Sequence, residues 1–183
     1  KTYTVQYFER ARFEWRKGSW PERFDVQLGL VGNEFVAMNG MTGDPAFAPV
    51  DTCPAGTSSA NCTLFQATGH SLSNGFKAYW ETYGGLAVFG YPISEAFTDK
   101  GFTVQYFERA RFEYHPENAG TPYVVLLGRL GAGAHRHRRA ARPDGGALLG
   151  PEQAGHPGRG AVAPPRSANS SKKRPKISIP LQS

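Results

Sequence analysis

Two pairs of glutamates are the residues whose types and spacing come closest to a catalytic arrangement. Glu9 and Glu14 lie five positions apart, and Glu108 and Glu113 repeat that spacing. Glycoside hydrolysis uses two carboxyl groups across a sugar bond, so such pairs invite that interpretation. Arginines lie between the members of each pair, however. We therefore expect local ion pairs on a solvated face rather than an acid and a base.

The rest of the sequence carries no recognisable catalytic motif. His70 and His115 have no neighbouring partner for base chemistry, and the chain contains no Gly-x-Ser-x-Gly, Walker or His-Glu-x-x-His pattern. The sequence therefore predicts a protein that is not an enzyme and that binds no cofactor.

Cys53 and Cys62 are the two cysteines of the chain, and they lie in a segment of small and polar residues. A structural zinc site needs about four ligands, and His70 is the nearest histidine, so we expect no metal site. The residues around the cysteines do not support a catalytic thiol either. We predict a local disulfide, which would stabilise the fold by about 2–3 kcal/mol and would indicate an oxidising, extracellular setting.

Aromatic and charged side chains in the middle of the chain are better candidates for binding than for catalysis. Tyrosine and tryptophan combine an apolar ring with a polar edge, which suits the surfaces of sugars and peptides. Arginine and glutamate beside them could supply the polar contacts of a groove. Exposed aromatics at equivalent positions would favour binding, whereas buried ones would favour a purely structural role. The predicted ligand-binding set is Tyr79, Trp80, Tyr91, Tyr106, Arg109, Arg111, Glu113 and Tyr114.

Several of these residues belong to a sequence that occurs twice. The eleven residues from Thr4 to Glu14 return unchanged from Thr103 to Glu113, ninety-nine positions later. The match resumes more loosely where residues 26–32 correspond to residues 125–131. An internal repeat of this kind indicates an array of one module. The second copy has a lead-in from residue 67 that the first copy lacks, so we expect that the chain begins inside a repeat.

This pattern divides the chain into four parts. Residues 1–32 are interpreted as the C-terminal half of a first repeat, and residues 33–66 as a Gly/Pro/Ser/Thr-rich connector that contains the disulfide loop. Residues 67–131 form a complete second repeat, and residues 132–183 form a tail of different composition. Each repeat is small, so its stability should depend on packing against a neighbouring repeat.

The complete repeat must position its polar residues with one helix and a few strands. Apolar spacing predicts a helix over residues 71–83, ended by Gly84 and Gly85. Alternating apolar residues predict strands over 102–106 and 111–114, and an apolar run predicts another strand over 123–127. The fold class is therefore α+β, with small repeats of one short helix and three or four short antiparallel strands, followed by a disordered C-terminal tail.

The net charge of +6 comes from the tail. Residues 1–131 contain 11 Lys/Arg and 13 Asp/Glu, whereas residues 132–183 contain 10 and 2. All 23 aromatic residues lie before residue 132, and nucleic-acid platforms need aromatic and basic groups interleaved. We therefore expect no nucleic-acid partner. The tail has too few apolar residues to fold, and its abrupt change of composition favours the hypothesis that it is not the native continuation.

The second copy resembles a known family of bacterial repeats. The motif runs from Gly84 to Glu95 and continues from Gly101 to Glu113. It resembles the LGFP repeat of secreted and cell-surface bacterial proteins, in a variant with a Tyr-Phe-Glu-Arg-Ala-Arg-Phe-Glu motif. The resemblance implies an extracellular, non-catalytic repeat that helps to anchor proteins to cell-wall polymers. The matching positions are Gly90, Pro92, Glu95, Gln105, Phe107 and Phe112.

Together these features predict a non-catalytic, extracellular or cell-surface module of a larger secreted bacterial protein. We expect it to bind cell-wall polymer or another polysaccharide, to pack against neighbouring repeats and to have no membrane span. A purely structural spacer beside a catalytic domain is the alternative. A fragment of a cell-wall hydrolase is a third hypothesis.

Overall fold

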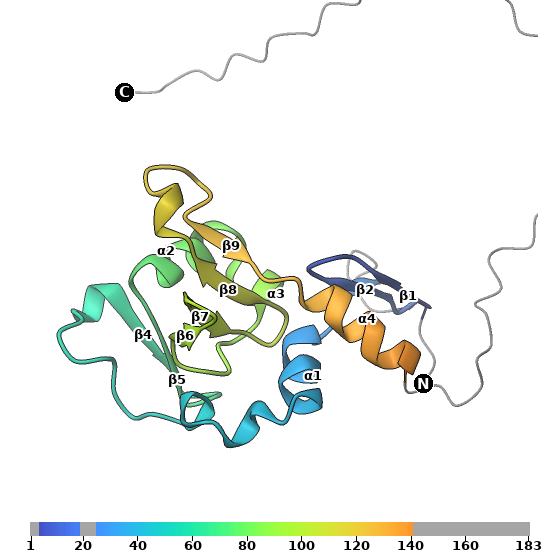
Figure 1. Cartoon of the computed structure of the whole chain (residues 1–183), viewed down its shortest axis with the longest axis horizontal. Helices are drawn as coiled ribbons and strands as arrows, with labels where there is room; N and C mark the ends of the chain where they lie inside the picture. Colours follow the sequence, from blue (N-terminus) through green and yellow to red (C-terminus); the bar gives the residue numbers. More distant parts are fainter. Residues whose placement is uncertain (1–3, 19–24, 141–183) are drawn as a thin grey trace, which may run out of the picture. The chain divides into compact units, whose positions relative to one another are not determined.

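The structure is a computed structural model of the chain, and it describes residues 4–18 and 25–140 (Figure 1). These residues form helices and antiparallel sheets, so the predicted α+β class is confirmed. No helix among them is both long and apolar enough to cross a membrane. The predictions for residues 141–183, which make up most of the tail that the sequence predicts to be disordered, lie outside the described residues.

The first copy of the repeated sequence forms a three-stranded antiparallel sheet in the order β1-β2-β3. Its strands are β1 (Thr4–Tyr7), β2 (Arg12–Trp15) and β3 (Val26–Leu28), and helix α1 (Val31–Met38) follows them. A hydrogen bond of 2.8 Å from the Phe8 amide to the Ala11 carbonyl closes the turn between β1 and β2. The identical residues therefore form a hairpin.

The second copy forms the same hairpin inside a four-stranded antiparallel sheet, in the order β6-β7-β8-β9. Tyr106 faces Arg111 just as Tyr7 faces Arg12, so the strand register of the two hairpins is the same. The sheet has one more strand than that of the first copy, and helix α4 follows it. The elements are β6 (Phe97–Asp99), β7 (Phe102–Tyr106), β8 (Arg111–Tyr114), β9 (Val125–Leu127) and α4 (Leu130–Ala140).

A hairpin and two short helices connect the two sheets. Strands β4 (Cys62–Phe65) and β5 (His70–Ser73) pair with each other, and helices α2 (Asn74–Thr82) and α3 (Gly85–Phe89) lead into the second sheet. The predicted disulfide between Cys53 and Cys62 is confirmed. Four single-turn 3₁₀ helices complete the described elements: η2 (Met41–Gly43), η3 (Pro45–Phe47), η4 (Ser59–Asn61) and η5 (Pro116–Asn118).

Three boundaries differ from the sequence prediction. Helix α2 begins at Asn74 instead of residue 71, because residues 70–73 pair with β4 as a strand. The last strand covers Val125–Leu127 of the predicted span 123–127. Residues 132–140, where the sequence predicts disorder, belong to helix α4, because the first turns of this helix are buried against α1. The strands at 102–106 and 111–114 agree with the prediction.

The core of the second copy lies where α2 and α3 cover one face of its sheet. The ring of Phe112 is central, with its centroid 4.2 Å from that of Phe107 and 4.8 Å from that of Phe89. Burying one such side chain stabilises a fold by about 1.5–3 kcal/mol. The buried members of this cluster are Leu72, Phe76, Phe89, Phe107, Ala110, Phe112 and Val125.

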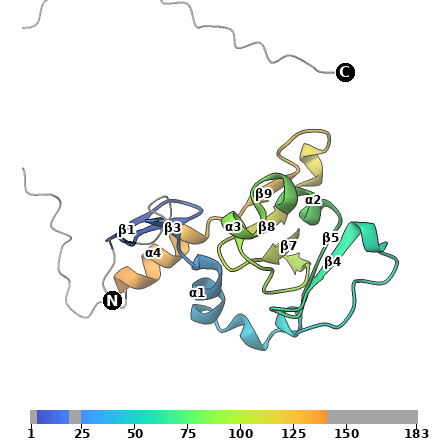
Figure 2. The same cartoon turned by 180° about the vertical axis from the view of Figure 1, so that it is seen from behind.

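A second cluster joins the two copies, and helices α1 and α4 lie side by side within it (Figure 1 and Figure 2). The Tyr106 ring of the second sheet stacks on Phe35 of α1, with 6.1 Å between centroids. The Tyr7 ring of the first sheet lies 5.1 Å from that of His135 in α4. Each helix therefore contacts the sheet of the other copy. The buried members are Val31, Val36, Val104, Tyr106, Leu130 and Ala134.

The start of each helix is anchored on the turn of the other copy. In α1, the amides of Gly32 and Asn33 donate to the Glu108 carbonyl oxygen at 3.0 and 3.3 Å. In α4, the Ala132 amide donates to the Glu9 carbonyl oxygen at 3.1 Å. The first amides of a helix lack partners within the helix, so the carbonyl of a turn satisfies them. Because Glu9 and Glu108 are equivalent residues, the two copies fasten each other by the same contact.

The arginine of each turn adds a second reciprocal bond. Arg10 Nη1 donates to the Leu127 carbonyl oxygen at 2.8 Å, and Arg109 Nε donates to the Leu28 carbonyl oxygen at 3.2 Å. Arg10 corresponds to Arg109, and Leu28 corresponds to Leu127. The repeated Glu-Arg pair therefore supplies both an acceptor and a donor to the other copy.

A glycine is required where each helix meets the turn. A Cβ atom on Gly32 would lie 1.8 Å from the Phe107 carbonyl oxygen, and one on Gly131 would lie 2.0 Å from the Phe8 carbonyl oxygen. Both distances are far below van der Waals contact, and the obstacle is backbone, which cannot rotate away. A side chain at either position would push the helix off the turn.

Replacing either glycine with alanine should weaken this contact. We expect Gly32→Ala and Gly131→Ala each to lower the free energy of unfolding by about 1–3 kcal/mol, the usual cost of overpacking. Gly75→Ala is the matched control, because a Cβ there meets nothing within 4 Å and alanine favours a helix over glycine by about 1 kcal/mol. Urea unfolding measures the free energy of unfolding of all three variants. Equal midpoints for Gly32→Ala and Gly75→Ala would contradict the contact.

Candidate functional site

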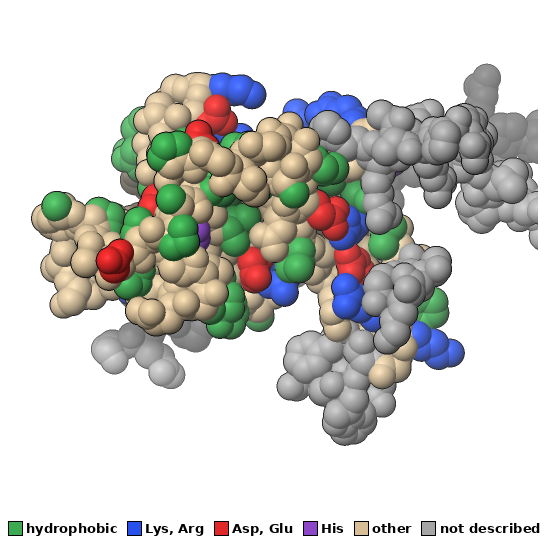
Figure 3. Space-filling model, turned by 90° about the horizontal axis from the view of Figure 1, so that it is seen from below, with side chains coloured by type: hydrophobic (Ala, Val, Ile, Leu, Met, Phe, Trp, Pro, Cys, Tyr) green, Lys and Arg blue, Asp and Glu red, His purple; other side chains and the backbone are tan. Residues whose placement is uncertain are grey.

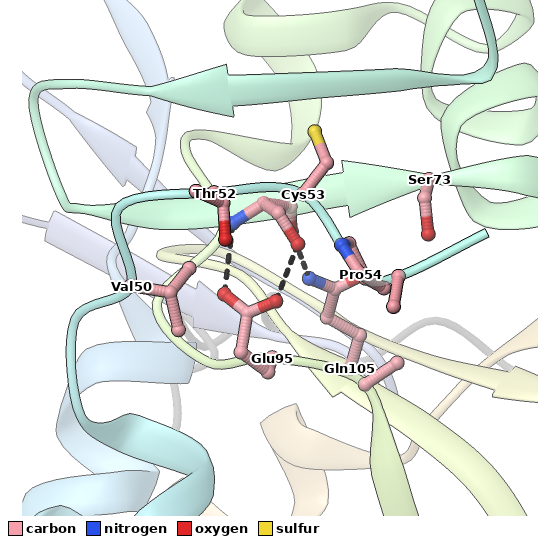
Figure 4. A pocket seen from close by; sticks show the side chains of 10 residues that line it. Val50, Thr52, Cys53, Pro54, Ser73, Glu95 and Gln105 are labelled. Atoms are coloured by element: carbon pink, nitrogen blue, oxygen red, sulfur yellow. Dashed lines mark hydrogen bonds between the residues drawn. The ribbon is translucent and has the colours of Figure 1, made fainter. Parts of the chain in front are cut away.

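A pocket of about 370 Å³ lies beside the disulfide. Figure 4 shows the side chains of Glu95 and Gln105 next to each other and directed into it. With Ser71, these residues bring a carboxylate, an amide and a hydroxyl to one place. The full lining consists of Val50, Thr52, Cys53, Pro54, Ala55, Ser71, Ser73, Glu95, Ala96 and Gln105.

The disulfide holds one wall of the pocket. Cys53 lies in an irregular segment, and its bond to Cys62 ties that segment to the first residue of β4. A hydrogen bond of 2.7 Å from the Val50 amide to the Gly69 carbonyl fastens the same segment next to β5. Residues 50–55 belong to no helix or strand. The covalent bond therefore substitutes for the backbone ladder that would otherwise position them.

Glu95 is fixed in the pocket by bonds to its backbone and to its carboxylate. Its amide donates to the Ala46 carbonyl at 2.7 Å. Its carboxylate accepts hydrogen bonds from the Ser71 amide at 2.8 Å and from Ser71 Oγ, and it lies 3.2 Å from His70 Nδ1. Burial works to raise the pKa of Glu95, but the bonds from His70 and Ser71 outweigh it and lower that pKa below its ordinary value.

Gln105 is buried and sets the positions of its neighbours. Its Nε2 donates to the carbonyl oxygens of Ser71 at 2.7 Å and of Ser94 at 2.8 Å. Ser94 is also buried, and its Oγ accepts from the Tyr106 amide at 3.0 Å and donates to the Glu95 carbonyl at 2.9 Å. Leaving a buried polar group without a partner costs about 1–3 kcal/mol, so this network resists rearrangement.

The arrangement suits the binding of hydrogen-bond donors better than it suits catalysis. A carboxylate with a lowered pKa stays ionised at neutral pH and accepts bonds from hydroxyl, amide or ammonium groups. Ser71 Oγ donates directly to Glu95, and His70 contacts the other carboxylate oxygen, so no histidine activates the serine. Among the side chains of residues 4–18 and 25–136, no three from His, Cys, Asp or Glu gather where they could hold a metal ion.

Tyr79 and Trp80, the first members of the predicted ligand-binding set, lie in the core of the second copy and do not line the pocket. The Tyr79 ring lies 5.0 Å from that of Phe112, and burial raises its pKa. Trp80 packs on the same cluster and donates from Nε1 to the Gly90 carbonyl at 3.0 Å. Both side chains thus have structural contacts.

Tyr91, Tyr106 and Tyr114 differ widely in exposure. Tyr106 is buried in the cluster that joins the copies, and Tyr91 is partly buried with its ring 5.6 Å from that of Phe65. Tyr114, by contrast, is 40% exposed, and its equivalent in the first copy, Trp15, is 49% exposed. Tyr114 and Trp15 therefore form the pair of exposed, equivalent aromatics that binding by both copies would need.

Arg111 and Glu113 take part in ion pairs within the fold. Arg111 lies 3.0 Å from Asp99 and 3.4 Å from Glu113. The equivalent Arg12 is buried, and it lies 2.5 Å from Glu14. The arginines between the paired glutamates thus form the predicted local ion pairs. The predicted solvated face is wrong for the first copy, because Arg12 and Glu14 are 5% and 4% exposed.

Acidic and basic side chains lie next to one another on the face shown in Figure 3. Among the charged residues of the two turns, Arg109 lies 3.7 Å from Glu108, and Arg129 lies 2.7 Å from Glu9. Opposite charges at such distances largely offset each other in the field that a distant ligand would feel. Among the side chains drawn in colour in Figure 3, acidic and basic groups are interleaved, so they form no single-sign patch of the kind that attracts a polyanion.

The sequence places Glu95 and Gln105 in the repeat motif, but it does not place them in a site. In the structure, Gln105 and both of its neighbours, Val104 and Tyr106, are buried, so this glutamine needs hydrogen-bond partners inside the protein. The identical Gln6 in the first copy is exposed. The local sequence therefore does not reveal the pocket, which depends on the hairpin and loop that precede the second copy.

Glu95 should make the stability of the fold depend on pH. Its folded pKa lies below the ordinary value of 4.5, so its ionisation stabilises the fold fully above that value. This contribution is lost as the pH falls through the lower folded pKa. We expect Glu95→Gln to flatten the fall in melting temperature below pH 4.5. Glu81→Gln, at an exposed carboxylate paired with Lys77, is the control, and equal slopes in both variants would contradict the Glu95 network.

No protein-family model, curated protein or solved structure matches this chain. The resemblance to the LGFP repeat therefore stays a prediction that rests on the motif residues. The role of the chain has to be argued from its own geometry.

Proposed function

We propose that the chain is a non-catalytic, extracellular module in which two copies of a repeat fasten each other into a structural scaffold. The observation that carries this proposal is the reciprocal contact, in which each turn accepts the helix start of the other copy. Such a scaffold would hold neighbouring parts of a larger protein at a fixed spacing.

A structural role gives a reason for the identity of the eleven repeated residues. Glu9 and Arg10 of the first turn bond to the start of α4 and to the end of β9, and the equivalent residues of the second turn bond to the start of α1 and to the end of β3. Tyr7 and its equivalent Tyr106 pack against the helix of the other copy. These reciprocal contacts give a reason, without a ligand, for the same tyrosine and the same arginine in both copies, because each side chain reaches the other copy.

The disulfide supports the extracellular part of the proposal. Disulfides persist in oxidising compartments and are rare in the cytosol, and the bond between Cys53 and Cys62 is compatible with an extracellular protein. The non-catalytic part rests on the pocket, where Ser71 and His70 both bond to Glu95, so that His70 does not activate the Ser71 hydroxyl.

Polysaccharide binding is the second candidate, and the exposure of Trp15 and Tyr114 favours it. The two residues end the equivalent strands β2 and β8. Exposed aromatic rings at matching places in two repeats could each stack on a sugar ring of one long polymer. In this proposal the polymer would be a cell-wall polymer, and the scaffold would set the distance between the two rings.

Sedimentation with purified peptidoglycan, cellulose or chitin separates the two candidates. A purely structural role predicts that the full chain stays in the supernatant with all three polymers. Polysaccharide binding predicts that the chain enters the pellet and that the Trp15→Ala/Tyr114→Ala variant is retained at least about tenfold more weakly, as for the loss of aromatic anchors. Sedimentation of the wild-type chain would therefore contradict a purely structural role.

A further inference from the structure

One face of the first sheet exposes apolar side chains whose equivalents are buried in the second sheet. Phe8, Phe13 and Val26 are 43%, 40% and 56% exposed, and we call them the Phe8 face. Their equivalents Phe107, Phe112 and Val125 are 0%, 0% and 3% exposed. Clustered apolar side chains on a surface mark a place where another structure binds. The sequence is the same at the two phenylalanines and at the valine, so the difference lies in what covers them.

The second copy shows what fits such a face. Helices α2 and α3 lie over Phe107 and Phe112, and the centroids of Phe76 and Phe89 lie 5.9 and 4.8 Å from that of Phe112. The pair of rings beneath them is nearly the same in both copies. The centroids are 4.7 Å apart for Phe8 and Phe13, and 4.2 Å apart for Phe107 and Phe112. The first copy therefore already has the shape that the helices cover.

The backbone of the first turn also has two donors that match this cover. In the second copy, the amides of Glu108 and Arg109 donate to the carbonyl oxygens of Tyr91 and Phe89, both at 3.0 Å. Among the described residues, the equivalent amides of Glu9 and Arg10 bond to no acceptor. The cover would thus bring two hydrogen bonds as well as apolar side chains.

The edge of the first sheet repeats the same difference. Strand β7 pairs with β6 on one side and with β8 on the other, whereas β1 pairs with β2 alone among the described strands. In the second copy the cover and the edge strand are one continuous segment, because α3 leads through the Pro92 corner to β6. A single strand–helix–helix–strand segment would satisfy the face, the two amides and the edge together.

We propose that the Phe8 face binds a segment of the kind formed by residues 70–99, supplied by the same polypeptide ahead of the first copy. This segment would need one phenylalanine at the place of Phe76 and another at the place of Phe89. It would also need two free carbonyl oxygens around the end of its second helix, and an edge strand. The inference rests on the proposed scaffold role, because a covered Phe8 face adds a further repeat to the array. Trp15 borders the Phe8 face, because it pairs with Val26 and lies two positions after Phe13 on β2. The two tests stay distinguishable, because the fused chain is followed by the protection of the Glu9 and Arg10 amides and the polymer test by sedimentation.

A fused chain tests this inference directly. Lys1 corresponds to Lys100 in the ninety-nine-residue period, so residues 67–99 can be joined to Lys1 of the full chain without a linker. We expect the fusion to raise the melting temperature by at least about 5 °C and to halve, approximately, the fluorescence of a dye that binds apolar surface. We also expect the Glu9 and Arg10 amides to become protected from hydrogen exchange.

Two matched variants show whether the face itself is responsible. Val26→Asp should leave the melting temperature of the original chain nearly unchanged, because the side chain is exposed, and should abolish the gain in the fused chain. Phe89→Asp in the added segment alone should abolish it as well. Unchanged hydrogen exchange at the Glu9 and Arg10 amides of the fusion would overturn the inference. A dimer of the original chain that Val26→Asp dissociates would also overturn it, because a second copy of the chain would then cover the Phe8 face.

Discussion

The backbone carbonyl of the turn glutamate, Glu9 in one copy and Glu108 in the other, is the acceptor around which the described structure is organised. The Glu108 carbonyl receives two amides and the Glu9 carbonyl one, in each case from the first turn of a helix that belongs to the opposite copy. A helix start carries unsatisfied donors and a partial positive charge, so a turn carbonyl is a natural partner when the helix can come close. Gly32 and Gly131 permit that approach, because any Cβ there would meet backbone oxygen.

This constraint accounts for the way in which two small sheets share one core. Both α1 and α4 contribute to the cluster around Val31, Tyr106 and Leu130. A domain of this size has a marginal core by itself. Because each helix packs against the sheet of the other copy, one apolar cluster is the core for both copies. The second copy then adds a cover of helices on its outer face, whereas the first copy leaves the Phe8 face open.

Local features of this chain are the ones that the sequence predicts well. The strands at 102–106 and 111–114 follow from their alternation of side chains, and the disulfide follows from the absence of other partners for Cys53 and Cys62. The role of Glu9 and Glu108 cannot be predicted in this way, because a backbone oxygen makes the contact with a helix that lies far away in the sequence. The periodicity of side chains describes only the local structure. Residues 71–73 fit a helical pattern in isolation, yet pairing with β4 outweighs that preference. The pocket around Glu95 is missed for the same reason, since a distant loop and a disulfide complete it.

The central claim is that the two copies form one cooperative unit through their turns. Tryptophan fluorescence measures it most directly, because Trp15 reports on the first copy and Trp80 on the second. Two variants, Trp20→Phe/Trp80→Phe and Trp15→Phe/Trp20→Phe, each leave one reporter, and urea unfolding is followed by fluorescence and by circular dichroism. The account predicts that the two signals coincide in each variant, with one midpoint and one slope. A Trp15 transition at lower urea than the circular dichroism transition of the same variant would contradict it.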